Sequence, residues 1–180
     1  MLLPVLLALA PAELPSRPII CHIEAARYVL RADPTVTARF HIVPRTEDWR
    51  WGVALEIRLG ATGRTSWWLP FLGGTSDVHG LRWTARRGTP EAMPGYRYNL
   101  LDLQYFAFED DYDMINTTPM RGDYAPQHML LNDLREAFWY RDDPDHRYSP
   151  PRSLFDLTGC ADEAAEGIQS ETDVLFPRVP

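Results

Sequence analysis

Alternation of apolar and polar side chains in the first half of the chain most constrains its fold. Apolar residues occupy every second position from Val36 to Ile42, and the pattern returns from Trp51 to Leu59. This period of two places alternate side chains on opposite faces of a half-buried strand. Gly60-Ala-Thr-Gly63 is typical of a tight hairpin turn, with a partner strand over 64–71. We therefore predict an antiparallel meander of strands 36–43, 51–59 and 64–71.

The remaining elements are predicted to be more strands and one helix. Further strands are expected at 27–31, 81–86 and 100–108, with a last short element over 153–160. Pro126 suits the first turn of a helix. Leu130, Leu131, Leu134 and Phe138 then fall on one helical stripe, which predicts a helix near 127–140. Sixteen prolines spread along the chain argue against longer helices.

These elements predict an α+β fold. We expect an antiparallel β-sheet of five or six strands, with the helix near 127–140 packed on one face, because one-sided strands need a covering layer. The alternative is a β-sandwich with a helical appendage.

The N-terminal segment has the pattern of a secretory leader. Leu2 to Ala10 is a short apolar run, and Ala10-Pro11-Ala12 matches the small-residue pattern of a signal-peptidase site. We predict a signal peptide over 1–12, a single globular domain over 13–160 and an acidic, flexible tail over 161–180. The location would then be periplasmic or secreted. The alternative is an apolar arm packed on a cytosolic domain.

The two cysteines support the same location. Cys21 and Cys160 lie near the two ends of the predicted domain. In an oxidising compartment such a pair is expected to form a disulfide. The alternative is two unrelated buried thiols.

Composition excludes several function classes. All 18 basic residues are arginine, so a Schiff-base lysine and a P-loop lysine are both ruled out. Twenty-five acidic residues give a net charge of −7, which disfavours nucleic acid as a partner. No apolar run approaches the roughly 20 residues of a transmembrane helix. No cofactor motif is present.

Tryptophans provide the candidate ligand-binding residues. Trp67 and Trp68 are adjacent in a predicted strand and must face opposite sides. Trp67 shares parity with Leu69 and Phe71, so we assign it to the core and Trp68 to the outer face. An outward tryptophan offers a stacking surface for a ligand or partner. We name Trp68, Trp49 and His79 as candidates; the alternative is a second core layer.

Acidic residues provide weak metal and catalytic candidates. Asp110, Asp111 and Asp113 offer oxygen ligands, although their order does not match an EF-hand loop. The simpler interpretation is a solvated turn that ends a strand. Asp77 and His79 lie in a glycine-rich loop and are the weak candidates for a catalytic pair.

Polar residues on the outer face of the 36–59 hairpin form a further candidate surface. Arg39 and His41 are expected to lie opposite Glu56 and Arg58. Cross-strand charge pairing explains this arrangement, and a polar binding surface is the alternative.

The sequence contains no catalytic motif that identifies a reaction. We therefore predict a small exported bacterial protein, a non-enzymatic binding or accessory protein of the cell envelope. Its partner would be an unknown ligand or an envelope protein. The alternative is a hydrolase that uses acidic residues and His79.

Overall fold

The computed structural model describes residues 18–45, 49–73, 78–84, 102–141 and 147–161. The predicted signal peptide, Asp77 and the tail beyond Ala161 lie outside these residues.

The described chain is mostly β-strand. The strands are β1 (Ala26–Leu30), β2 (Asp33–Ile42), β3 (Val53–Leu59), β4 (Arg64–Gly73), β5 (Val78–Thr84), β6 (Leu103–Phe108), β7 (Met114–Ile115), β8 (His128–Asn132) and β9 (Phe155–Cys160). A single turn of 3-10 helix, η1 (Ile23–Ala25), precedes β1. An α-helix, α1 (Leu134–Arg141), separates β8 from β9.

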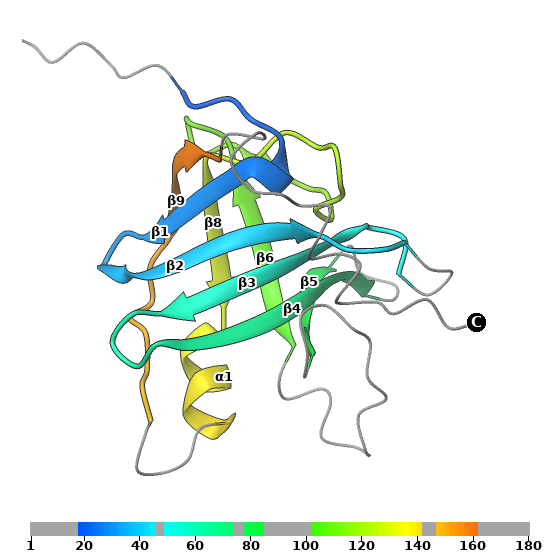
Figure 1. Cartoon of the computed structure of the whole chain (residues 1–180). Coiled ribbons are helices and arrows are strands. Elements are labelled where there is room, and N and C mark those ends of the chain that lie inside the picture. Colours follow the sequence, from blue (N-terminus) through cyan, green and yellow to red (C-terminus); the bar gives the residue numbers. More distant parts are fainter. Residues whose placement is uncertain (1–17, 46–48, 74–77, 85–101, 142–146, 162–180) are drawn as a thin grey trace, which may run out of the picture.

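The sheet closes into an eight-stranded antiparallel barrel (Figure 1). Neighbouring strands run in the order β5-β4-β3-β2-β1-β9-β8-β6, and β5 also pairs with β6, which completes the ring. The short β7 pairs with the end of β6 and lies outside the count of eight. Among the described strands every pairing is antiparallel, so the strands form an up-and-down arrangement.

The predicted α+β fold with an open sheet is wrong, and so is the alternative β-sandwich. The α+β fold required a helix to cover the inner face of the sheet, and the β-sandwich required a second sheet. Here the sheet closes, because β1 pairs with β9 and β5 pairs with β6. The side chains of its inner face therefore pack against one another. The helix α1 has only eight residues and lies at the end of the barrel where β8 ends (Figure 1).

The predicted meander over 36–71 is confirmed. Phe40 pairs with Leu55, and Leu55 pairs with Trp68, so one row of side chains crosses β2, β3 and β4 on the same face. The turn after β3 also forms as predicted. Gly63 has a φ of +66°, in the region that favours glycine. Gly60 lies so close to the backbone of Thr35 that a Cβ there would clash with it.

The interior of the barrel is filled by side chains. Alternate residues along each strand point inward, and their large apolar side chains form one core. This core includes Tyr28, Leu30, Phe40, Leu55, Ile57, Leu59, Trp68, Leu81, Leu103, Met129 and Phe155. An eight-stranded barrel is narrow enough for side chains to pack across it. Large residues on facing strands therefore hold the closed sheet together.

Only the second part of the predicted helix near 127–140 is helical, and the first part is a strand. Residues His128–Asn132 form the strand β8, and only Leu134–Arg141 are helical. Met129 and Leu131 point into the core, whereas Leu130 is only half buried. Pairing with β6 on one side and β9 on the other supplies the backbone hydrogen bonds that a helix would have made. Asp133, with a φ of +66°, separates the two elements.

The predicted disulfide is confirmed. Cys21 bonds to Cys160 across 139 residues, with Cα atoms 6.1 Å apart. The bond ties the segment before η1 to the end of β9.

Candidate functional site

A groove opens at the end of the barrel near η1. It lies between η1, the end of β6 and the chain from β7 to β8, and its volume is about 470 Å³. The groove is lined by Ile23, Tyr105, Glu109, Ile115, Thr117, Thr118, Pro119, Met120, Gly122, Asp123, Tyr124 and Pro126. We call this set the mouth groove.

Hydrogen bonds and a ring stack hold one wall of the mouth groove against the N-terminal segment. The backbone N–H of Ile23 donates to the carbonyl of Asp123 at 2.9 Å, and that of Ala125 donates to Cys21 at 2.8 Å. The His22 ring stacks on Tyr124, with ring centroids 5.3 Å apart. Since Cys21 is also bound to Cys160, the loop beside the groove is cross-linked to the barrel. This wall is preformed, which reduces the ordering cost of binding.

The Tyr105 hydroxyl is the unusual group of the mouth groove. Tyr105 points inward from β6 and is only 4% exposed. No described residue makes a hydrogen bond to its hydroxyl. Solvent in the groove can reach that hydroxyl oxygen. By contrast, the buried Tyr28 hydroxyl donates to the Pro126 carbonyl at 3.1 Å. A buried hydroxyl normally has a partner, so Tyr105 presents an unused hydrogen-bonding group to the groove.

The electrostatic environment keeps this hydroxyl protonated. Burial raises the pKa of Tyr105, and the negative charge of Asp123 raises that pKa further. Asp123 is itself held in place, because the Met120 N–H donates to its carboxylate at 2.9 Å. Glu109 is the second carboxylate in the lining. Among the described lining residues there is no arginine or histidine, so the groove is negatively charged.

Apolar side chains surround the mouth groove. Met120 is 40% exposed and Tyr124 70% exposed, and both line the groove. Ile20 and Met114, which are close in sequence to the lining residues Ile23 and Ile115, are also exposed. Exposed apolar groups gathered in one area are typical of a binding surface.

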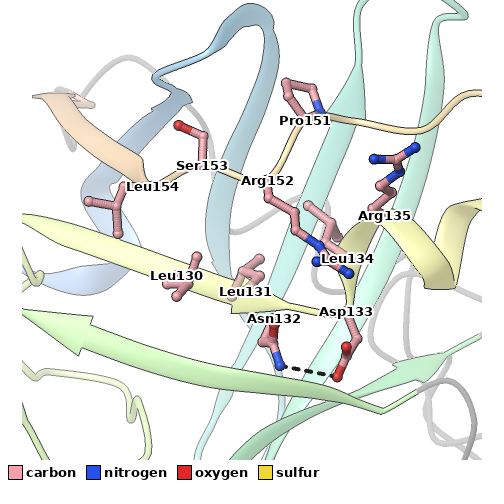
Figure 2. A pocket seen from close by; sticks show the side chains of 10 residues that line it. All are labelled: Leu130, Leu131, Asn132, Asp133, Leu134, Arg135, Pro151, Arg152, Ser153 and Leu154. Carbon is pink, nitrogen blue, oxygen red and sulfur yellow. Dashed lines mark hydrogen bonds between the residues drawn. The ribbon is translucent and has the colours of Figure 1, made fainter.

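A second, smaller cavity lies between β8 and the segment before β9 (Figure 2). It arises because β8 and β9 pair only at His128 and Met129. Its volume is about 270 Å³, and leucines of β8, α1 and the 151–154 segment line it. Three charged residues, Asp133, Arg135 and Arg152, are part of its lining, and Arg152 donates to Glu136 at 2.5 Å. None of its described lining residues is a buried residue with an unpaired hydroxyl, as Tyr105 is in the mouth groove.

The outward orientation predicted for Trp68 is wrong. Trp68 is fully buried inside the barrel, and its ring N–H donates to the Ser66 hydroxyl at 2.9 Å. Trp67 lies instead on the outer face, opposite Glu56 and 4.8 Å from the His41 ring. The inner face of the barrel continues from Leu55 to Trp68, and this register sets the orientation of both rings.

Trp49 also belongs to the outer face. With Trp67 it packs against a small cluster formed by Val43, Ala54 and Leu69. Its ring lies 6.0 Å from that of Trp51, edge to face. Trp49 therefore packs on the outer face of the sheet, and it is not among the residues that line the mouth groove.

His79 is held by two neighbours. Its Nε2 donates to Asn116 Oδ1 at 2.9 Å, and the Thr118 hydroxyl donates to Nδ1 at 2.7 Å. Both ring nitrogens are therefore engaged in tethering β5 to the chain after β7. Its proposed partner Asp77 lies outside the described residues.

The acidic run forms a turn. The Glu109 N–H donates to Asp113, and the Tyr112 N–H donates to Glu109, which closes the chain between β6 and β7. Asp110, Asp111 and Asp113 are exposed on this turn. In the part of the chain that the structure describes, no three acidic, histidine or cysteine residues gather closely enough to hold a metal ion.

The polar pairing predicted between β2 and β3 is present. Arg39 lies opposite Glu56 in the register, whereas His41 lies opposite Ala54 and Arg58 opposite Thr37. The His41 Nε2 donates to Glu56 at 2.6 Å, and Arg58 reaches the same carboxylate at 3.3 Å. The hydrogen bond from His41 is the main cause of the lowered pKa of Glu56. His41, Glu56 and Arg58 therefore satisfy one another along the sheet.

The mouth groove was not predicted from the sequence. Its lining comes from η1, β6 and the 115–126 chain, which the sequence marks only as an apolar run and a proline-containing loop. Comparisons with protein-family models, curated proteins and solved structures found no match. None of the helices in the described segments is long and apolar enough to cross a membrane.

Proposed function

We propose that this protein is an exported, non-enzymatic binding protein of a bacterial envelope, with its ligand seated in the mouth groove. The observation that carries the proposal is the Tyr105 hydroxyl, which belongs to a buried side chain, opens onto the groove and has no hydrogen-bond partner among the described residues. Ligand sites combine apolar walls with a few placed polar groups, and they occur in the mouths of β-barrels.

The N-terminal apolar run and the disulfide support export. The apolar run before Ala10-Pro11-Ala12 has the pattern of a leader. The Cys21–Cys160 disulfide is of the kind that persists in oxidising compartments. Together these features favour a periplasmic or secreted location.

The hydrolase alternative gains no support from His79. A general base needs a ring nitrogen that faces a substrate. Here both nitrogens of His79 bind Asn116 and Thr118. A binding role is therefore the better explanation of the described residues.

Binding in the mouth groove can be tested with a neutral apolar fluorophore, N-phenylnaphthylamine. We expect its fluorescence to rise on addition of the protein, and Met120→Arg to weaken binding at least about tenfold. The control is Trp139→Arg, since Trp139 is 42% exposed, much like Met120, but lies on α1 at the other end of the barrel. Equal affinity for wild type and the Met120 variant would place the probe elsewhere and overturn the assignment.

A further inference from the structure

We infer that the ligand of the mouth groove is a small molecule that carries a protonated amine on an apolar body. This inference rests on the proposed function and adds the chemical class of the ligand. It is carried by the charges, the free hydroxyl and the volume of the groove.

The charges of the groove select for a cation. Glu109 and Asp123 both line it, and the described lining contains no basic side chain to neutralise them. Just beyond the lining, Glu24 accepts a hydrogen bond from the Gly122 N–H at 3.2 Å. Asp123 is half buried, so less water screens its carboxylate than one on an open surface, and it attracts an ammonium more strongly.

The Tyr105 hydroxyl complements the same ligand. A phenol oxygen can accept a hydrogen bond from an ammonium N–H. The negative potential of Asp123 that opposes ionisation of Tyr105 also favours a positive charge beside it. The hydroxyl and the carboxylate therefore act on one group of the ligand.

The rest of the lining suits an apolar body. Ile23, Ile115, Pro119 and Pro126 present hydrocarbon surface, and Tyr124 adds an aromatic ring. The volume of about 470 Å³ falls in the range of small-molecule sites. A compact aromatic or aliphatic amine would contact these groups and the two polar groups together.

Three probes with one apolar body and different charges test the inference. They are phenethylamine, which is cationic, phenethyl alcohol, which is neutral, and hydrocinnamate, which is anionic. Binding is measured by NMR from the shifts of the backbone amide signals of the non-proline residues in 115–126. We expect the amine to bind at least about fivefold more tightly than the alcohol, and hydrocinnamate to bind weakest.

Variants then locate the charge that matters. Asp123→Asn keeps an oxygen that can accept from the Met120 N–H, and we expect it to lower the amine affinity about fivefold without affecting the alcohol. Asp133→Asn removes the same charge at the start of α1 and is the matched control. If the Asp123 variant does not fold, Glu109→Gln replaces it, since Glu109 lines the groove from an exposed turn.

The outcomes separate the two proposals. Equal affinities for the amine and the alcohol would overturn the cation inference and leave the binding site standing. Equal losses in the Asp123 and Asp133 variants would also overturn it, because only net charge would then matter. Failure of all three probes and of N-phenylnaphthylamine at the groove would overturn the proposed function itself.

Discussion

At the scale of single residues, the tryptophan pair shows how register decides exposure. Trp67 and Trp68 are chemically identical neighbours, and the strand pattern places them on opposite faces. Leu69, buried on the outer face by Val43 and Ala54, made that face look like the core in the sequence. The inner position of Trp68 is stabilised by full burial and by its hydrogen bond to Ser66.

Substituting each tryptophan should give unequal losses. We expect Trp68→Ala to lower the free energy of unfolding by about 3–5 kcal/mol, because it leaves a large cavity in the core. Trp67→Ala removes a half-buried ring and should cost about 1 kcal/mol. Urea unfolding followed by circular dichroism measures both. A larger loss for Trp67 would contradict the register of β4.

Asp156 is a second residue whose role depends on tertiary contacts. Arg31 donates to both of its carboxylate oxygens at 2.8 Å, and His128 Nδ1 donates at 2.7 Å. Tyr112 stacks on His128 and accepts a hydrogen bond from Arg31. The hydrogen bonds from Arg31 are the main cause of the lowered pKa of Asp156. This carboxylate therefore joins the residue after β1 to β8 and β9, and both of its partners contact Tyr112 in the turn after β6.

The contribution of Asp156 should depend on pH. At neutral pH we expect Asp156→Asn to lower the free energy of unfolding by about 1–2 kcal/mol, since two charge-assisted contacts are weakened. A lowered pKa in the folded state stabilises the protein above the ordinary carboxyl pKa of 3.8. That stabilisation is lost as the pH falls through the folded-state pKa, so the difference between wild type and variant should shrink below pH 3.8.

The measurement for Asp156 is urea unfolding at a series of pH values. Asp110→Asn is the control, because Asp110 is exposed on the turn. A difference that stays constant from neutral to acid pH would exclude the role of the Asp156 charge.

At the scale of elements, β8 shows why a helical stripe and a strand are hard to separate over a short segment. Leu130, Leu131, Leu134 and Phe138 fit a helical period, yet Leu134 and Phe138 are helical while Leu130 and Leu131 lie in a strand. Five residues of β8 are too few for periodicity to decide, and β6 and β9 stand on either side as pairing partners. Tertiary pairing overrides the local pattern.

Neighbouring substitutions in β8 distinguish the two structures. In the barrel Leu131 is buried and Leu130 half buried. We expect Leu131→Asn to cost about 3–5 kcal/mol, from lost burial and an unpaired polar group, and Leu130→Asn only about 1 kcal/mol. Thermal unfolding of both variants provides the comparison. Similar losses would be the result of a helical stripe that buries both residues.

At the scale of the whole molecule, closure of the sheet determines both the core and the mouth groove. Pairing of β5 with β6 involves only Gly80 with Gln104 and Leu81 with Leu103. The barrel is completed on the other side by β1 and β9, which lie at opposite ends of the described chain. The disulfide adds a covalent bond beside this second, long-range pairing.

Removing the disulfide should destabilise the barrel without changing its fold. We expect the double variant Cys21→Ser, Cys160→Ser to lose about 2–5 kcal/mol, mainly because the unfolded chain regains the freedom of a long loop. Urea unfolding of wild type and variant, without reductant, gives the difference. Free thiols in the oxidised wild-type protein, detected by mass spectrometry, would contradict the bond.

The sequence alone predicted most of the strands and the disulfide. The alternation in β2 and β3, the turn at Gly60-Ala-Thr-Gly63 and the apolar run of β6 are local signals, because backbone geometry requires a period of two wherever a strand is buried on one side. Cysteine pairing was predictable because only one pair exists.

Only the tertiary structure decided that the sheet closes, which tryptophan lies inside and where the mouth groove opens. Closure depends on strands that meet across long stretches of chain, and no local pattern encodes which distant strand becomes the neighbour. The orientation of Trp68 follows from that closure, since the inner face exists only once the ring is complete. Tyr105 shows the same limit: in the sequence it is one aromatic residue in an apolar strand, and only folding leaves its hydroxyl facing a charged groove with no hydrogen-bond partner among the described residues.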